Sequence, residues 1–392
     1  MARLHRVYLS PGMFGFGKLG TYDYFAHVER ALVARFRAAG EELHTFVADV
    51  APTSSVRRRA VSLAELIGQT ASNDNGPIHL FGHSTGGLDA RLVASPTAHY
   101  STNHEDFRWL SRLSSVTTMS TPHYGTPLAG FFATVSGQRM LYAISALTVT
   151  GLSLGAPPLA AASAVVMAIG RIDRALGIEL RMLDRTTNAL LAALEPATST
   201  EVERYLDAIR RDQGAVIQLT PEAMDLFFAG VEDRPGVTYQ CTCTMVPPPS
   251  PRRIARSLPS VWRALSSIIF TTMHRITSRY DEVYPCTPPD WSEEAQQMFQ
   301  RTFERTPSPS ENDGVVPILS QIWGRIVWAG YGDHLDVIGH FSGARQATIS
   351  RLSADPEADN AHVDWMMSGS KFDESAFEEM MDAVAGGMLS ST

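Results

Sequence analysis

The pattern of apolar and polar positions changes its period repeatedly along the first 126 residues. Short, mostly apolar runs are typical of buried strands, and they lie at 5–10, 43–50, 78–81 and 115–119. Between them, apolar residues recur at the spacing of one helix face, over 25–36, 56–67 and 88–94. Strands that alternate with helices predict a mostly parallel central sheet with helices on both faces.

The alternation stops near residue 127 and resumes near 236, so we divide the chain into three parts. Residues 1–126 form the first part of an α/β core, and 236–392 form the second. Residues 127–235 are apolar and Ala-rich at first and amphipathic later, which predicts a helical cap or lid. In the second core part we expect strands, a C-terminal helix and a Pro-rich insertion of unassigned structure, at 237–244, 325–328, 377–384 and about 246–311.

Composition excludes some classes of protein. A net charge of −8 argues against nucleic acid as a partner, because no basic field neutralises phosphates. The three cysteines do not make a disulfide scaffold, and Cys241 and Cys243 would point to opposite faces of one strand.

Two stretches bear on membranes and location. No charged residue lies between Arg139 and Arg171, which is the length of a transmembrane span. Glycines and Pro157-Pro158 interrupt it, so we expect an apolar cap and no transmembrane anchor. The N-terminal residues run directly into a strand, and no signal peptide is visible. Location stays open between the cytoplasm and secretion with the signal removed.

The segment Gly82-His83-Ser84-Thr85-Gly86 carries the strongest chemical signal. It reads G-x-S-x-G and stands between an apolar run and a helical run, which is the context of a nucleophile elbow. In that turn, a side chain at either glycine would collide with neighbouring backbone, and the serine oxygen is exposed at the sheet edge. The helix that follows favours a developing oxyanion at its N-terminus. Ser84 is therefore the predicted nucleophile.

A serine nucleophile needs a base and a carboxylate that orients the base. In proteins with a nucleophile elbow, the acid and then the histidine follow the serine in the sequence, each after a late strand. Asp313 and His334 occupy those places. His340 is a rival base on the same segment as His334. The rival acids are Asp281, Asp290, Asp333 and Asp336.

Four motifs occur in the same order as in a known family. They are Pro11-Gly12-Met13-Phe14-Gly15-Phe16 with Tyr22-Asp23-Tyr24-Phe25, then Gly82-His83-Ser84-Thr85-Gly86-Gly87, then Ser120-Thr121-Pro122-His123-Tyr124-Gly125-Thr126, then Asn312-Asp313-Gly314-Val315-Val316 with His334-Leu335-Asp336. The set resembles the bacterial true lipases related to the Pseudomonas and Burkholderia triacylglycerol lipases. The likeness anchors most of the chain and is weak in the cap and in residues 246–311.

The resemblance implies an α/β-hydrolase fold, with Ser84 as nucleophile, His334 as base and Asp313 as acid. It also implies that the backbone N–H groups of Met13 and Thr85 form the oxyanion hole. Both positions suit that role, because Thr85 stands at a helix start and Met13 in a glycine-flanked loop.

The chain departs from the family in two places. The family usually has His-Gly where this chain has Pro11-Gly12, so the oxyanion hole survives with different hydrogen-bond support. Many relatives have a cysteine near Pro317 and Ile318, so that disulfide is absent here.

Relatives also bind a structural calcium, which the resemblance assigns to Asp336, two residues past the base. A second carboxylate ligand is not located, and Asp336 as a helix N-cap is the alternative. No cofactor is expected to be required for catalysis.

The binding residues are predicted from apolar character. Phe14, Phe16 and the cap suggest an acyl cleft, with ordinary core packing as the alternative. His123 either lines that cleft or is structural, and His83 is expected to pack beside the nucleophile. A cap that opens in transient contact with a lipid surface would explain charge-free residues beside the site.

Together these features predict a serine hydrolase that cleaves esters of lipids or other water-insoluble aliphatic esters, including polyesters, through an acyl-serine intermediate. With the same triad, the alternatives are a polyhydroxyalkanoate depolymerase, a small-ester carboxylesterase and an acyltransferase. A non-catalytic binding protein of the same fold is the alternative from another class.

Overall fold

The computed structural model describes most of the chain. It covers residues 2–13, 18–19, 22–71, 75–100, 104–135, 137–138, 140–141, 144–145, 196–250, 261–339, 341, 364 and 366–392. Within those ranges, no helix is both long enough and apolar enough to cross a membrane.

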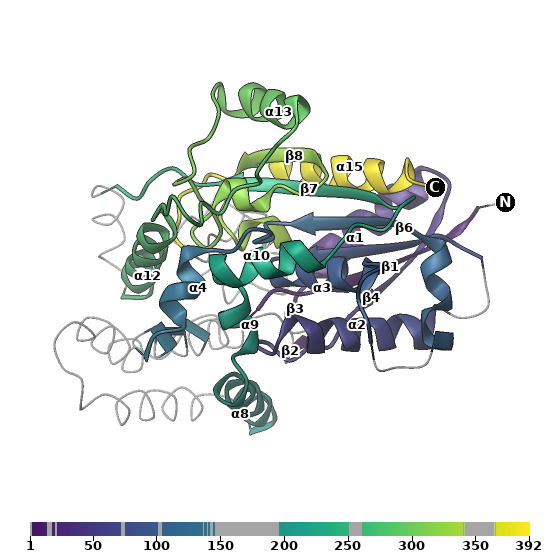
Figure 1. The fold of residues 1–392 in the computed structure, drawn as a ribbon, viewed down its shortest axis with the longest axis horizontal. Helices are drawn as coiled ribbons and strands as arrows, with labels where there is room; N and C mark the ends of the chain where they lie inside the picture. The colour runs from purple at the N-terminus through teal and green to yellow at the C-terminus, as the bar shows by residue number, and fades with distance from the viewer. Residues whose placement is uncertain are drawn as a thin grey trace.

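A parallel sheet of six strands forms the centre of the molecule, in the order β4-β1-β5-β6-β7-β8 (Figure 1). Each neighbouring pair in it is parallel. The strands are β1 Leu4–Ser10, β4 Glu42–Val47, β5 Ile78–His83, β6 Leu113–Met119, β7 Thr238–Met245 and β8 Arg325–Tyr331. A separate antiparallel pair consists of β2 Lys18–Leu19 and β3 Tyr22–Asp23. The predicted parallel sheet is confirmed, and β8 runs three residues past its expected end at 328.

Helices cover both faces of this sheet, as the alternating periods predicted. The pleat of β1 shows the division, because successive side chains of a strand point to opposite faces. Val7 and Leu9 pack in one cluster with α1 and α15, whereas Tyr8 packs in another with α2 and α3. These helices are α1 Ala26–Ala38, α2 Val56–Thr70, α3 Thr85–Ala94 and α15 Glu374–Leu389. A 3₁₀ segment, His104–Arg112, precedes β6 and was not predicted.

Most of the described residues of the 127–235 insertion lie in helices. They form α4 Pro127–Phe132, α8 Pro196–Arg211, α9 Gly214–Gln218 and α10 Pro221–Gly230. Most of the charge-free stretch lies outside the described residues. The division of the chain into core and cap stays a prediction.

The Pro-rich insertion contains two helices that the sequence analysis left unassigned. They are α12 Val261–Thr277 and α13 Glu293–Phe303. Neither helix contains proline, so the helix-breaking prolines of this insertion lie in the connections between the helices. The Ser292 hydroxyl caps the start of α13 by accepting from the Ala295 N–H.

Apolar side chains of α4, α9 and α12 pack together in a cluster that includes Leu128, Val216 and Met273. In Figure 1, α4 and α12 lie beyond the end of the sheet opposite to the two chain termini. Met13 and Val315 pack against this cluster. The insertions therefore adjoin the loops that carry the predicted oxyanion donor and the predicted acid.

Candidate active site

Ser84 stands at a strained corner between β5 and α3. Its backbone has φ 55° and ψ −127°, which a non-glycine residue rarely adopts. A Cβ at Gly82 would lie 2.2 Å from the Gly86 carbonyl, and one at Gly86 would lie 2.0 Å from the Ser10 carbonyl oxygen. Only glycine fits at either position, so the elbow that the motif predicted is confirmed.

The elbow sits at the carboxyl end of a central strand, where parallel α/β sheets place their sites. The Ser84 N–H donates to the Met119 carbonyl at the end of β6, at 2.8 Å. Asp313 follows β7 after the Pro-rich insertion, and His334 follows β8. The fold is that of an α/β-hydrolase.

Three residues that are far apart in the sequence meet at the elbow. Nε2 of His334 lies 2.9 Å from Oγ of Ser84, and its Nδ1 lies 2.8 Å from Oδ2 of Asp313. An ionised carboxylate only accepts hydrogen bonds, so Nδ1 carries the hydrogen and Nε2 presents a lone pair to the serine hydroxyl. Ser84 and His334 are each 6% exposed, and Asp313 is fully buried. In this arrangement Nε2 of His334 can accept the proton of the Ser84 hydroxyl. The catalytic roles of the three residues stay a prediction.

Backbone groups hold the Asp313 carboxylate. Its Oδ1 accepts from the N–H groups of Val315 and Val316, at 2.9 and 2.7 Å. The His334 N–H donates to the Asp313 carbonyl at 3.0 Å. Asp313 and His334 are thus hydrogen-bonded to each other through their side chains and through their backbones.

Gln321 also contacts the acid, and sequence reasoning missed it. Its Nε2 donates to Asp313 Oδ2 at 3.3 Å and to the Thr244 carbonyl at 3.0 Å. Its Oε1 accepts from the Thr244 N–H at 2.8 Å. The one available signal was an amide side chain within the apolar run of residues 315–322.

Both predicted oxyanion donors stand in segments that adjoin the serine. Thr85 is the first residue of α3, where helical N–H groups lack an intrahelical acceptor. Met13 follows Gly12, and a Cβ at Gly12 would lie 3.0 Å from the Ser84 Cβ. The loop of residues 11–13, hereafter the 11–13 loop, therefore runs directly past the nucleophile. Donation from Met13 and Thr85 stays a prediction.

Side chains that the sequence analysis did not single out hold the 11–13 loop. Arg59 donates to the Pro11 carbonyl and pairs with Asp89 at 2.8 Å, with both side chains fully buried. Asp89 also accepts from the Ser10 hydroxyl at 2.8 Å. Burial raises the pKa of Asp89, and the Arg59 guanidinium acts against that rise. These contacts hold the Pro11 carbonyl and the end of β1 in place.

His123 lies in a structural cluster. Its ring is fully buried, with Nδ1 3.1 Å from Nη1 of Arg91 and Nε2 3.0 Å from the Thr118 hydroxyl. It stacks on Trp323 at 5.4 Å between ring centroids. Burial, followed by the charge of Arg91, holds the pKa of His123 well below its usual value. These contacts favour the structural alternative for His123 over a role in substrate binding.

Three residues of the sequence analysis lie outside the described residues. They are Phe14 and Phe16, which are predicted to line the acyl cleft, and the rival base His340. The rival acid Asp281 instead accepts from the N–H groups of Val283 and Tyr284 in an exposed loop.

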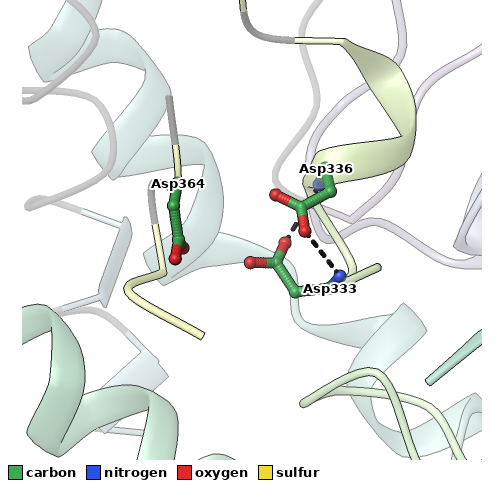
Figure 2. Close-up of side chains that lie close together, drawn as sticks. All are labelled: Asp333, Asp336 and Asp364. Atoms are coloured by element: carbon green, nitrogen blue, oxygen red, sulfur yellow. Dashed lines mark hydrogen bonds between the residues drawn. The ribbon is translucent and has the colours of Figure 1, made fainter. Parts of the chain in front are cut away.

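Three carboxylates converge beside the loop that carries His334 (Figure 2). One oxygen from each of Asp333, Asp336 and Asp364 lies within 4.8 Å of the others. Asp333 Oδ1 accepts from the N–H groups of Leu335 and Asp336, at 2.8 and 2.9 Å. Asp336 Oδ2 accepts from the Asp333 N–H at 2.8 Å. Asp333 therefore caps the turn of residues 333–336, and Asp336 is the first residue of the 3₁₀ helix η3 Asp336–Ile338, so the alternative of Asp336 as an N-cap is wrong.

The residues of this cluster fit a calcium ion. Oδ2 of Asp333 is buried and has no hydrogen-bond partner among the described residues. Burial raises the pKa of Asp333 well above its usual value, and the carboxylates of Asp336 and Asp364 raise it further. Carboxylate oxygens are the ligands that calcium prefers. Asp333 and Asp364 are the carboxylates that lie close enough to Asp336 to share such a site.

No protein-family model matches the sequence, and no curated protein matches it. Among solved structures, EstA from Clostridium botulinum is similar at 17% identity and a TM-score of 0.43, over 96% of this chain and 87% of EstA. The Staphylococcus hyicus lipase is similar at 16% identity and a TM-score of 0.45, over 85% of this chain and 88% of the lipase. Lipase 1 from Pelosinus fermentans is similar at 17% identity and a TM-score of 0.45, over 90% of this chain and 99% of the lipase.

Proposed function

We propose that this protein is a serine hydrolase that cleaves carboxylic esters through an acyl-serine intermediate. The observation that carries the proposal is the hydrogen-bonded series from Asp313 through His334 to Ser84 at a strained elbow. The order of the four motifs, which resembles that of the Pseudomonas and Burkholderia type lipases, supports the same chemistry.

The reaction needs only side chains and backbone groups of the chain. The Ser84 hydroxyl gives its proton to Nε2 of His334 while Oγ attacks the acyl carbon. The N–H groups of Met13 and Thr85 bind the oxyanion, and each such donor contributes about 3 kcal/mol. Collapse breaks the ester C–O bond, and the leaving alcohol takes the proton from Nε2. Water then repeats the sequence and releases the acid.

The favoured substrates are esters of lipids or other water-insoluble aliphatic esters. Large apolar side chains on the insertion helices support this class, because they are exposed on helices whose buried residues belong to the two apolar clusters against which Met13 packs. Ile217 is 62% exposed on α9, Leu226 is 77% exposed on α10 and Ile268 is 39% exposed on α12. Such exposed apolar groups favour transient contact with a lipid surface.

The experiment compares wild type with Ser84→Ala. We expect wild type to take up a fluorophosphonate label and to hydrolyse p-nitrophenyl esters, and the variant to do neither while keeping its unfolding temperature. Ester hydrolysis by a folded Ser84→Ala protein would reject the proposal.

A series of acyl chain lengths, above and below the solubility limit, tests the substrate class; a preference for short soluble esters would contradict it. Adding an alcohol acceptor and analysing the products separates hydrolysis from acyl transfer.

We further propose that Asp333, Asp336 and Asp364 hold a calcium ion that stabilises the loop carrying His334. The unpaired Asp333 oxygen and the three converging carboxylates support this. The ion would supply a structural cross-link between that loop and the segment at residue 364.

A further inference from the structure

His83 forms hydrogen bonds to two separate parts of the site. Its Nε2 lies 2.9 Å from the backbone carbonyl oxygen of His334. A carbonyl only accepts, so Nε2 must carry the hydrogen. In the neutral imidazole Nδ1 is then an acceptor, and it lies 2.7 Å from the Tyr24 hydroxyl, which donates to it.

The Tyr24 hydroxyl continues this connection to the 11–13 loop. The Gly12 N–H donates to it at 3.4 Å. Burial raises the pKa of Tyr24 far above its usual value, so the hydroxyl keeps the proton that it donates to His83. Tyr24 is 7% exposed and His83 is 1% exposed, so solvent does not compete strongly for these bonds.

One buried hydrogen-bonded series therefore joins the 11–13 loop, which carries the predicted oxyanion donor Met13, to the segment that carries the predicted base His334. It runs from the Gly12 N–H through Tyr24 and His83 to the His334 backbone. His83 also precedes the nucleophile in the chain, so its ring is anchored to the elbow itself.

We propose that Tyr24 and His83 are a positioning pair that sets the 11–13 loop at a defined place relative to His334. The inference rests on the proposed ester hydrolysis and assigns two residues that act through Gly12 and His334 rather than on the substrate.

The test measures kcat and KM for a p-nitrophenyl ester in Tyr24→Phe, His83→Leu and His83→Gln. A displacement of the base or the oxyanion donors by about 1 Å costs on the order of 100-fold in rate. We expect kcat to fall about 10- to 100-fold in Tyr24→Phe and His83→Leu, with KM within about twofold. His83→Gln should recover part of the loss, because its amide N–H can donate to the His334 carbonyl.

The double variant Tyr24→Phe/His83→Gln shows whether the pair acts as one unit. Both changes interrupt the same series, so the double variant should be about as slow as the slower single variant. Independent structural damage would instead multiply the two losses.

Tyr8→Phe is the matched control. Tyr8 is fully buried on β1, and its hydroxyl accepts from the Thr70 hydroxyl at 3.0 Å, on the opposite face of the sheet from α1. This variant loses a buried tyrosine hydrogen bond far from the proposed chemistry. Its unfolding temperature should fall about as much as that of Tyr24→Phe, with kcat unchanged.

The inference is overturned if folded Tyr24→Phe and His83→Gln keep the kcat of the Tyr8→Phe control, or if their losses multiply. If His83→Leu does not fold, the other two variants decide by the same criterion. Failure of the wild type to hydrolyse any ester or to bind the fluorophosphonate would overturn the proposed function and this inference together, which distinguishes that result from failure of the pair alone.

Discussion

Arg59 and Asp89 form a fully buried ion pair, with Nη2 of the arginine 2.8 Å from Oδ2 of the aspartate. Arg58, the preceding residue on α2, pairs with Asp212 at the same 2.8 Å, but those side chains are 69% and 31% exposed. The two pairs thus match in distance and differ in burial. The buried pair also reaches the active site, because Arg59 donates to the Pro11 carbonyl.

We predict that Arg59→Leu destabilises the protein by about 3–5 kcal/mol, because it leaves the Asp89 charge buried without its partner. It should also lower kcat through the 11–13 loop. Arg58→Ala should cost no more than about 1 kcal/mol, because water screens an exposed pair. Urea unfolding of both variants measures the difference. Equal losses of stability would show that burial does not govern the effect.

Asp313→Asn should keep the fold and lower kcat by about 10⁴-fold, the size of effect that the same change has in other Ser-His-Asp enzymes. An amide can present N–H to Nδ1 of His334, which favours the tautomer that cannot accept the serine proton. Steady-state kinetics on an ester measure this loss. Asp281→Asn is the control, since Asp281 lies in an exposed loop and should leave kcat unchanged. A slow Asp281→Asn with an active Asp313→Asn would reverse the assignment of the acid.

Calcium should raise the unfolding temperature of the wild type after treatment with EDTA, and magnesium should do so less, because it demands a tighter octahedral site. Asp333→Asn should lose most of this calcium response, since it removes a buried ligand oxygen. Without calcium this variant should be no less stable than the wild type, because three converging carboxylates become two.

Differential scanning fluorimetry with metal titration measures the response, and Asp290→Asn, at an exposed aspartate outside the cluster, is the control. An unchanged calcium response in Asp333→Asn would place any calcium elsewhere.

Acid should destabilise the protein through His79, which is fully buried in β5. Its Nε2 lies 3.0 Å from Nδ1 of His5, and its Nδ1 lies 2.8 Å from the Ser115 hydroxyl. Burial, followed by the charge of His5, lowers the pKa of His79 to about 3. The unfolded chain therefore takes up this proton at a higher pH than the folded protein does.

The stability that a neutral His79 allows is fully present above about pH 6.5 and is lost as the pH falls toward 3. The slope contributed by one such histidine is about 1.4 kcal/mol per pH unit. Urea unfolding between pH 7 and pH 5 should show a shallower slope in His79→Gln than in the wild type. His44→Gln, at a half-exposed histidine, should leave the slope unchanged. Equal slopes in all three proteins would exclude His79 as the source.

Particular residues show how far the sequence could lead. The elbow was predictable because its motif lies within five consecutive residues, and the steric limit at Gly82 is set by Gly86 inside that motif. The limit at Gly86 is set by Ser10 on β1, which the motif alone does not reveal. The helices of the 246–311 region were not assigned, because prolines in the connections hid the helical stretches between them. His123 was ambiguous, since nothing local says whether a histidine after a strand faces a cleft or a buried arginine.

The sequence by itself determined the order of the six sheet strands and of the four helices that cover the sheet, the elbow motif and the residue types that serine chemistry needs. These follow from hydrophobic period and from short motifs, which are read over a few neighbouring residues. Only the tertiary structure decided that Ser84 meets a histidine 250 positions away, that Gln321 reaches Asp313 and that Asp364 joins Asp333 and Asp336. Such contacts depend on strand register and on how loops pack across the sheet edge, and no local pattern along the chain encodes those distances.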